Sequence, residues 1–178
     1  IDCGPDFRQQ LLTNNITKVD SILFTHEHAD HTAGLDDVRP ISFKNGKIPI
    51  YAHDRVLKNL KHRFLYLFEK QNDYAGDIHL IPNTVYENEA FNLHDFTVKP
   101  ISYSHHKLQV FGYRINDFAY ITDLKKIDKS EKNKLLNLDC LVLNALRHHT
   151  HYSHINLEEA LQIIHEIKPK KTYLTHIA

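Results

Sequence analysis

The sequence contains no methionine, only two cysteines and no net charge, and each absence limits what the chain can be. Cys3 and Cys140 are too few for the disulfide framework of a small secreted domain, so we expect a reducing, cytoplasmic setting. Every apolar run is shorter than the roughly 18 residues that span a bilayer, which argues against a membrane protein. Because the chain begins at Ile1 and lacks methionine, we expect the natural protein to extend beyond both ends.

Charge and glycine usage exclude further classes. Lysine plus arginine and aspartate plus glutamate each number 22, so charge alone would hold neither bulk nucleic acid nor an anionic membrane. The five glycines form no phosphate-cradling loop, and no serine nucleophile elbow is present. With 178 residues, 42% of them hydrophobic and 25% charged, the sequence predicts one globular domain spanning residues 1–178.

Short apolar runs of strand composition alternate with helical patterns. Asn156 and Glu159 form a predicted capping box at the start of one helix. Apolar spacing predicts a second helix over residues 54–68 and a third, after Asp6, that turns Leu12 inward. Successive strands between residues 91 and 122, with strand–helix alternation on either side, favour a layered α/β fold with mixed sheets. The predicted strands are residues 21–25, 48–52, 78–81, 96–102, 110–115, 118–122, 140–143 and 172–175.

Histidine is the residue type in excess, with 15 copies. The densest group, Thr-His-Glu-His-Ala-Asp-His, directly follows the first predicted strand and places four potential metal ligands within six residues. Two of them, His26 and His28, are two residues apart and can project the same way, while Asp30 and His31 approach from another side after a turn. Imidazole and carboxylate ligands in this pattern indicate a site for two metal ions side by side.

This group resembles the HxHxDH motif of the metallo-β-lactamase superfamily of hydrolases. Other landmarks of that superfamily follow in order: Ile-Asp-Cys-Gly at the start, an isolated histidine in YSHHKL, an aspartate in AYITD and a last histidine in LTH. Together with LVLNALR and SHINLEEAL, they are most similar to the PhnP-like branch of cyclic phosphodiesterases. The resemblance implies an α/β fold, an αββα four-layer sandwich of two mixed β-sheets flanked by helices, with further strands ahead of Ile1.

The resemblance also implies roles for individual residues. One metal would be held by His26, His28 and His105, the other by Asp30, His31 and His176, with Asp123 bridging the two. A hydroxide shared by the two ions would attack the substrate, which makes Asp30 part of the catalytic machinery as well as a ligand. Zn²⁺ suits the histidine-rich set, and Mn²⁺ or Fe would also be tolerated by the carboxylates. Asp2 is expected outside the ligand set, orienting an imidazole.

Some positions leave alternatives open. His105 is favoured over His106 because the ligand in the relatives stands three residues before the leucine that Leu108 matches. His154 resembles a non-ligand histidine that donates a proton to the leaving oxygen in phosphodiesterase branches, and a helix-capping or exposed histidine is its alternative. His151 is expected to contact the substrate or one of the metal-ligating side chains. Further residues are expected to be structural or solvated: Cys3, Cys140, Lys107, Arg147, His148, His149, His53, His62, His79, His94 and His165.

The resulting functional hypothesis is a dinuclear metal-dependent phosphodiesterase that acts on a small cyclic or linear phosphodiester. A tRNase Z-like endonuclease that processes the 3′ end of tRNA is one alternative, although the zero net charge argues against it. A thioesterase or lactonase of the same fold is another, and a metal-binding domain without turnover is a third. The sequence leaves a homodimer open.

Overall fold

The computed structural model describes residues 1–69 and 80–178. They divide into two compact units, Ile1–Val85 and Tyr86–Ala178. Each unit has its own sheet and its own cluster of buried apolar side chains. The expectation of one domain over residues 1–178 stays a prediction. Within the described ranges, none of the helices has both the length and the hydropathy needed to cross a bilayer.

The first unit is built on a small sheet with the strand order β1-β2-β3, in which all described pairs are parallel. The strands are β1 (Ile22–Leu23), β2 (Ile48–Ala52) and β3 (Leu80–Thr84). The helices are α1 (Phe7–Thr13), α2 (Ala29–Thr32), α3 (Arg39–Asn45) and α4 (Asp54–Arg63), with 3₁₀ turns at Ala33–Val38 and Leu65–Leu67. Because parallel strands end at the same edge, the loop after β1 leaves from the carboxyl edge of this sheet.

The second unit is built on a larger, mixed sheet with the order β4-β5-β6-β7-β8-β9. Pairs from β4 to β7 are antiparallel, and β7, β8 and β9 run parallel. The strands are β4 (Phe91–Leu93), β5 (Phe96–His105), β6 (Leu108–Ile115), β7 (Phe118–Ile121), β8 (Cys140–Asn144) and β9 (Lys171–Thr175), and the helices are α5 (Lys129–Asn133) and α6 (Leu157–Ile167). The prediction of a mixed sheet is confirmed here, whereas the first unit's described pairs are parallel.

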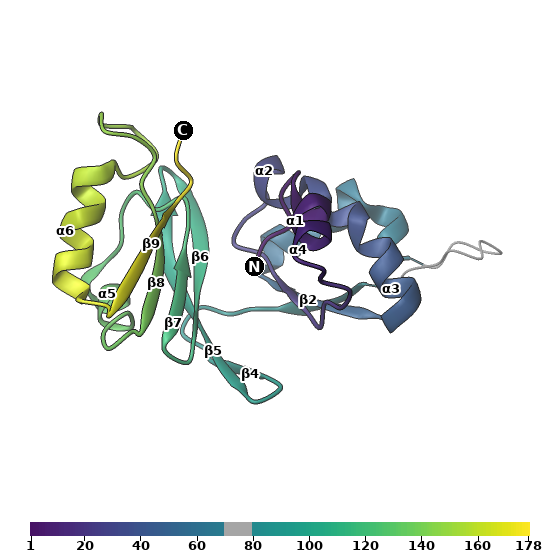
Figure 1. Cartoon of the computed structure of the whole chain (residues 1–178). Helices are drawn as coiled ribbons and strands as arrows, with labels where there is room; N and C mark the ends of the chain where they lie inside the picture. The colour runs from purple at the N-terminus through teal and green to yellow at the C-terminus, as the bar shows by residue number, and fades with distance from the viewer. Residues whose placement is uncertain (70–79) are drawn as a thin grey trace. The chain divides into compact units, whose positions relative to one another are not determined.

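Helix α6 lies along one face of the second sheet (Figure 1) and begins as the sequence predicts. The side chain of Asn156 accepts a hydrogen bond from the Glu159 amide, and the Glu159 side chain accepts one from the Asn156 amide, each at 2.8 Å. The helix ends at Ile167, and its C-cap residue Lys168 adopts a left-handed conformation ahead of Pro169. Ala160 and Ile167 pack into the apolar cluster of this unit.

Other boundaries differ from the predictions. The helix predicted over residues 54–68 ends at Arg63, because Phe64 leaves helical geometry with φ −125° and ψ 41°. Leu12 on α1 was predicted to face inward and is instead 62% exposed. The first strand has two residues rather than five. The strand predicted over residues 78–81 starts at Leu80 in the structure. Its first two predicted positions, Ile78 and His79, lie outside the described residues.

Candidate metal centre

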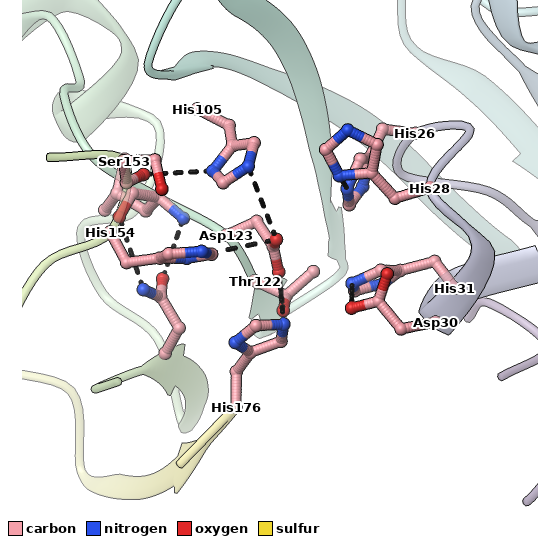
Figure 2. Close-up of polar contacts among 12 residues, drawn as sticks. His26, His28, Asp30, His31, His105, Thr122, Asp123, Ser153, His154 and His176 are labelled. Carbon is pink, nitrogen blue, oxygen red and sulfur yellow. Dashed lines mark hydrogen bonds and ion pairs between the residues drawn. The ribbon is translucent and has the colours of Figure 1, made fainter. Parts of the chain in front are cut away.

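The four predicted ligands of the first unit lie together in the loop after β1 and in the first turns of α2. The Nε2 atom of His26 lies 3.0 Å from Nδ1 of His28, and the ring of His26 lies 4.3 Å from that of His31. The Nε2 atom of His31 lies 3.2 Å from a carboxylate oxygen of Asp30. Figure 2 shows the His31 and Asp30 side chains turned toward each other. The structure thus brings together all four ligands that this motif predicts.

The Asp2 carboxylate accepts hydrogen bonds from residues of this group, as the sequence predicts. One carboxylate oxygen accepts the Thr25 amide at 2.8 Å, and the other accepts the Thr25 hydroxyl at 2.9 Å and Nδ1–H of His31 at 2.8 Å. The predicted contact of Asp2 with an imidazole of this motif is confirmed, and its role toward a bound metal stays a prediction. Gly4 is needed nearby, since a Cβ atom there would lie 2.6 Å from the Asp30 carbonyl oxygen.

The hydrogen bonds of Thr25 and Asp2 decide where the imidazole protons lie. The Thr25 hydroxyl donates its proton to Asp2 and therefore accepts from Nδ1–H of His26 at 3.0 Å. The Asp2 carboxylate can only accept, so Nδ1 of His31 also carries a proton. With the proton on Nδ1, the neutral form of each ring has its lone pair on Nε2, which is the form that binds a divalent metal.

Asp123 is the centre of the group in the second unit. It follows β7, is 2% exposed and adopts a left-handed backbone with φ 57°. One carboxylate oxygen accepts the Thr122 hydroxyl at 2.9 Å and lies 3.1 Å from Nε2 of His176. The other lies 4.0 Å from Nε2 of His105 and 3.9 Å from Nδ1 of His154. Figure 2 shows the three histidines around this carboxylate.

The structure brings His105, and not His106, to Asp123. His105 is 8% exposed, and its Nδ1–H donates to the Ser153 carbonyl at 2.9 Å, which leaves the lone pair on Nε2 facing Asp123. His106 is exposed at the tip of the β5–β6 hairpin, with its ring 5.5 Å from that of Tyr152.

His154 lies in the middle of the histidine group of this unit. Its ring is 4.5 Å from that of His105 and 5.0 Å from that of His176. Burial lowers the pKa of His154 to about 4, with further lowering by the neighbouring histidines, although the Asp123 carboxylate acts in the opposite direction. Neither alternative for His154 holds, because it is only 8% exposed and Asn156 caps α6.

The donors within each unit suit divalent metal ions. Neutral imidazoles and carboxylates are the ligands that zinc, manganese and iron accept, and Nδ1 of His26, His31 and His105 is in each case tied to a supporting group. The Nε2 atom of His31 lies 3.2 Å from an Asp30 oxygen. In the neutral tautomer with the proton on Nδ1, these two acceptors would be stabilised by a shared cation, since ligand atoms on a tetrahedral ion lie about 3.3 Å apart.

Sequence reasoning missed the side chains that hold the Asp123 turn. Asn144, fully buried at the end of β8, accepts the Leu124 amide at 2.9 Å and donates to the Leu124 carbonyl at 3.2 Å. The Tyr103 hydroxyl donates to the Thr122 carbonyl at 2.6 Å. A polar residue that ends the apolar run Cys-Leu-Val-Leu is the one signal that could have pointed to Asn144.

The remaining candidates are placed mostly as the sequence predicts. Cys3 is fully buried, and burial raises the pKa of its thiol to about 12, so it is a packing residue. Cys140 was predicted in the core and is instead half-buried. His151 contacts the Ser153 hydroxyl at 3.1 Å, next to the carbonyl that holds His105. Several of these candidates are exposed, and His53 is half-buried; the exposed ones are Lys107, Arg147, His148, His149, His62, His94 and His165.

Comparison with known proteins gives one family for nearly the whole chain. The family described as "Beta-lactamase superfamily domain" matches residues 1–177. Among solved structures, a diphosphatase from the PhnP family is 38% identical and superposes with a TM-score of 0.89 over 99% of this chain and 66% of that one.

Curated proteins are also similar at the sequence level. A protein of Porphyromonas gingivalis named octanoyltransferase is 38% identical over 100% of this chain, which corresponds to 36% of that protein. A ribonuclease Z of Limosilactobacillus reuteri is 30% identical over 75% of this chain and 43% of that protein. The chain therefore matches less than half the length of these curated relatives, and their names describe the whole proteins.

Proposed function

Because this chain belongs to the beta-lactamase superfamily, we propose that it is a metal-dependent hydrolase that cleaves a small cyclic or linear phosphodiester. The predicted metallo-β-lactamase fold, with two sheets flanked by helices, and the similarity to the PhnP branch are confirmed. The observation that carries the proposal is the buried Asp123 carboxylate at a strand end, with His105, His154 and His176 around it.

The residues proposed to hold two divalent ions are His26, His28, Asp30, His31, His105, Asp123 and His176. When bound, two such ions activate a water molecule as the nucleophile and stabilise the charge that develops on the phosphate. The donor chemistry suits Zn²⁺ first, and Mn²⁺ or Fe is compatible with the two carboxylates. The similarity to a PhnP-family diphosphatase supports phosphate chemistry.

The remaining side chains have orienting and proton-transfer roles in this proposal. Asp2, Thr25 and Ser153 fix the tautomers of the ligand imidazoles, so that Nε2 rather than Nδ1 presents its lone pair. His154 is not assigned as a ligand, and we place it as the group that protonates the leaving oxygen, a role that requires the negative charge of the bound phosphate to raise its pKa from about 4. The zero net charge favours a small substrate over a long nucleic acid.

The proposal is tested with bis(p-nitrophenyl) phosphate after metal removal and after reconstitution with Zn²⁺ or Mn²⁺. We expect turnover only in the reconstituted protein, and loss of both turnover and bound metal in His26→Ala, measured by elemental analysis. Absence of turnover in metal-loaded protein, together with an unchanged metal content in His26→Ala, would exclude the proposed function. A thioester and a lactone assayed in parallel separate the phosphodiesterase from other hydrolases of this fold.

A second candidate is processing of the 3′ end of tRNA, which the 30% identity to a ribonuclease Z favours. Binding to tRNA would then weaken steeply with salt, since phosphate contacts release counterions. Salt-independent or undetectable tRNA binding, together with turnover of the small diester, favours the first candidate.

A further inference from the structure

Two arginines of α4 converge on Glu27, the residue that separates His26 from His28. The Nε and Nη2 atoms of Arg55 donate to the two carboxylate oxygens of Glu27, at 2.9 Å and 3.2 Å. Nη1 of Arg63 donates to the backbone carbonyl of Glu27 at 2.9 Å. One helix therefore holds both the side chain and the main chain of the residue between two metal-ligand candidates.

The contacts of Arg63 extend to the backbone of His28. Nη1 of Arg63 also donates to the Thr32 hydroxyl at 2.8 Å, and that hydroxyl donates to the His28 carbonyl at 2.9 Å. Arg63, the last residue of α4, therefore binds the Glu27 carbonyl directly and the His28 carbonyl through the Thr32 hydroxyl. The Arg63 side chain thus holds the positions of both carbonyl groups.

Helix α4 is itself fixed in the first unit. It buries Val56, Leu57 and Leu60 in the apolar cluster, and the Nδ1 atom of His53 accepts the Arg55 amide at 3.1 Å at its start. Arg55 and Arg63 are eight residues apart, or about 12 Å along the helix axis. They therefore hold the loop from both ends of an anchored helix.

We infer that Arg55 and Arg63 are positioning residues that set the geometry of His26 and His28 for metal binding. This inference rests on the proposed function, because it needs these two histidines to be ligands. The fork of Arg55 is specific: a guanidinium bonds both oxygens of a carboxylate in one plane, and the ammonium of lysine cannot reproduce that geometry. Glu27 is 17% exposed at its side chain, so solvent weakens this pair less than a surface pair.

The experiment measures the affinity for Zn²⁺ by competition with a chromogenic chelator, together with thermal unfolding of the metal-free protein. We expect Arg55→Lys and Arg63→Gln each to weaken Zn²⁺ binding by about tenfold, the lower end of what loss of an outer hydrogen-bond partner costs a metal site. Lys58→Ala is the matched control, because Lys58 lies on the same helix in an exposed pair with Asp54. It should bind Zn²⁺ as the wild type does.

Two further variants separate positioning from general stability. Ile48→Ala makes a core cavity at the start of β2, away from the carboxyl edge where the loop begins, and should lower the unfolding temperature while leaving Zn²⁺ affinity unchanged. In the double variant Glu27→Gln/Arg55→Lys, the losses of affinity should not add, because both single changes break the same contact.

The outcomes separate the two proposals. The inference is overturned if Arg55→Lys and Arg63→Gln bind Zn²⁺ as tightly as the wild type while His26→Ala loses metal. It is also overturned if Ile48→Ala weakens Zn²⁺ binding as much as the arginine variants do. If His26→Ala keeps its metal, the inference fails because it needs His26 to be a ligand, and the proposed function fails as well when the metal-loaded protein shows no turnover.

Discussion

The Asp2 carboxylate accepts Nδ1–H of His31 at 2.8 Å, although 29 residues separate the two in sequence. The contact fixes the ring so that Nε2 faces the Asp30 carboxylate at 3.2 Å. A residue at the start of the chain therefore decides the tautomer and orientation of a ligand candidate on α2. The same carboxylate accepts hydrogen bonds from the Thr25 amide and hydroxyl, so the Asp2 side chain connects the loop after β1 to α2.

Replacing Asp2 with asparagine should weaken metal binding. An amide has only one acceptor oxygen, so at least one of the donors from Thr25 and His31 would face an NH₂ group. We expect about 10- to 100-fold weaker Zn²⁺ binding and a loss of about 1–3 kcal/mol in the free energy of unfolding. Chelator competition and urea unfolding measure the two effects. Asp6→Asn, at an exposed carboxylate before α1, is the control, and an unchanged Zn²⁺ affinity in Asp2→Asn would contradict the role assigned to Asp2.

Asn144 should stabilise the turn that carries Asp123. Asn144→Ala removes both side-chain hydrogen bonds to Leu124. The buried Leu124 amide then lacks an acceptor from Asn144, which should lower the free energy of unfolding by about 1–3 kcal/mol. Because Asp123 sits at φ 57°, a conformation that needs support from its surroundings, we also expect weaker Zn²⁺ binding. Titration of Zn²⁺ into the variant tests this. A stability loss with wild-type affinity would make Asn144 a fold residue only.

A companion variant checks the other side of the same turn. Tyr103→Phe removes the hydroxyl that donates to the Thr122 carbonyl and should shift Zn²⁺ affinity in the same direction as Asn144→Ala. Leu138→Ala, a core truncation in the same apolar cluster, should lower stability without a matching change in affinity.

The sequence predicts the parts of this molecule that depend on local patterns. The four ligand candidates of the first unit fall within six residues, and the capping box of α6 falls within four, so neither needs knowledge of the fold. The positions of Asp123 and His176 came from resemblance to a family rather than from spacing. The contacts of Asn144 and Ser153 could not be predicted, because they join residues that are 20 and 48 positions apart, through the pairing of β7 with β8 in the first case and through the loop after β8 in the second. The end of α4 at Arg63 could not be predicted either, because Phe64 leaves helical geometry and packs against the apolar cluster although the apolar spacing continues to Phe68.

The stability of the second unit should depend on pH through Glu159. Burial would raise the pKa of this carboxyl, but the Asn156 amide and the Lys125 ammonium outweigh it and lower the pKa below its usual range. A lowered folded pKa gives stability that is present above the unfolded value, about 4.3, and lost as the pH falls through the folded value. The difference in unfolding temperature between wild type and Glu159→Gln should therefore be largest near neutral pH and shrink in acid. Exposed Glu158, changed to glutamine, is the control, and a difference that does not vary with pH would contradict this role.

His154 should matter most for substrates with poor leaving groups. A proton donor contributes about 10²–10⁴-fold to a step in which the leaving oxygen needs protonation, whereas p-nitrophenolate leaves readily without it. We expect His154→Ala to lower kcat strongly on an alkyl phosphodiester and far less on bis(p-nitrophenyl) phosphate, with the metal content unchanged. His149→Ala, at an exposed histidine of the same loop, should behave as the wild type on both substrates. Equal losses on both substrates, accompanied by loss of one metal ion, would instead make His154 a ligand, a role that its distance of 3.9 Å from Asp123 also permits.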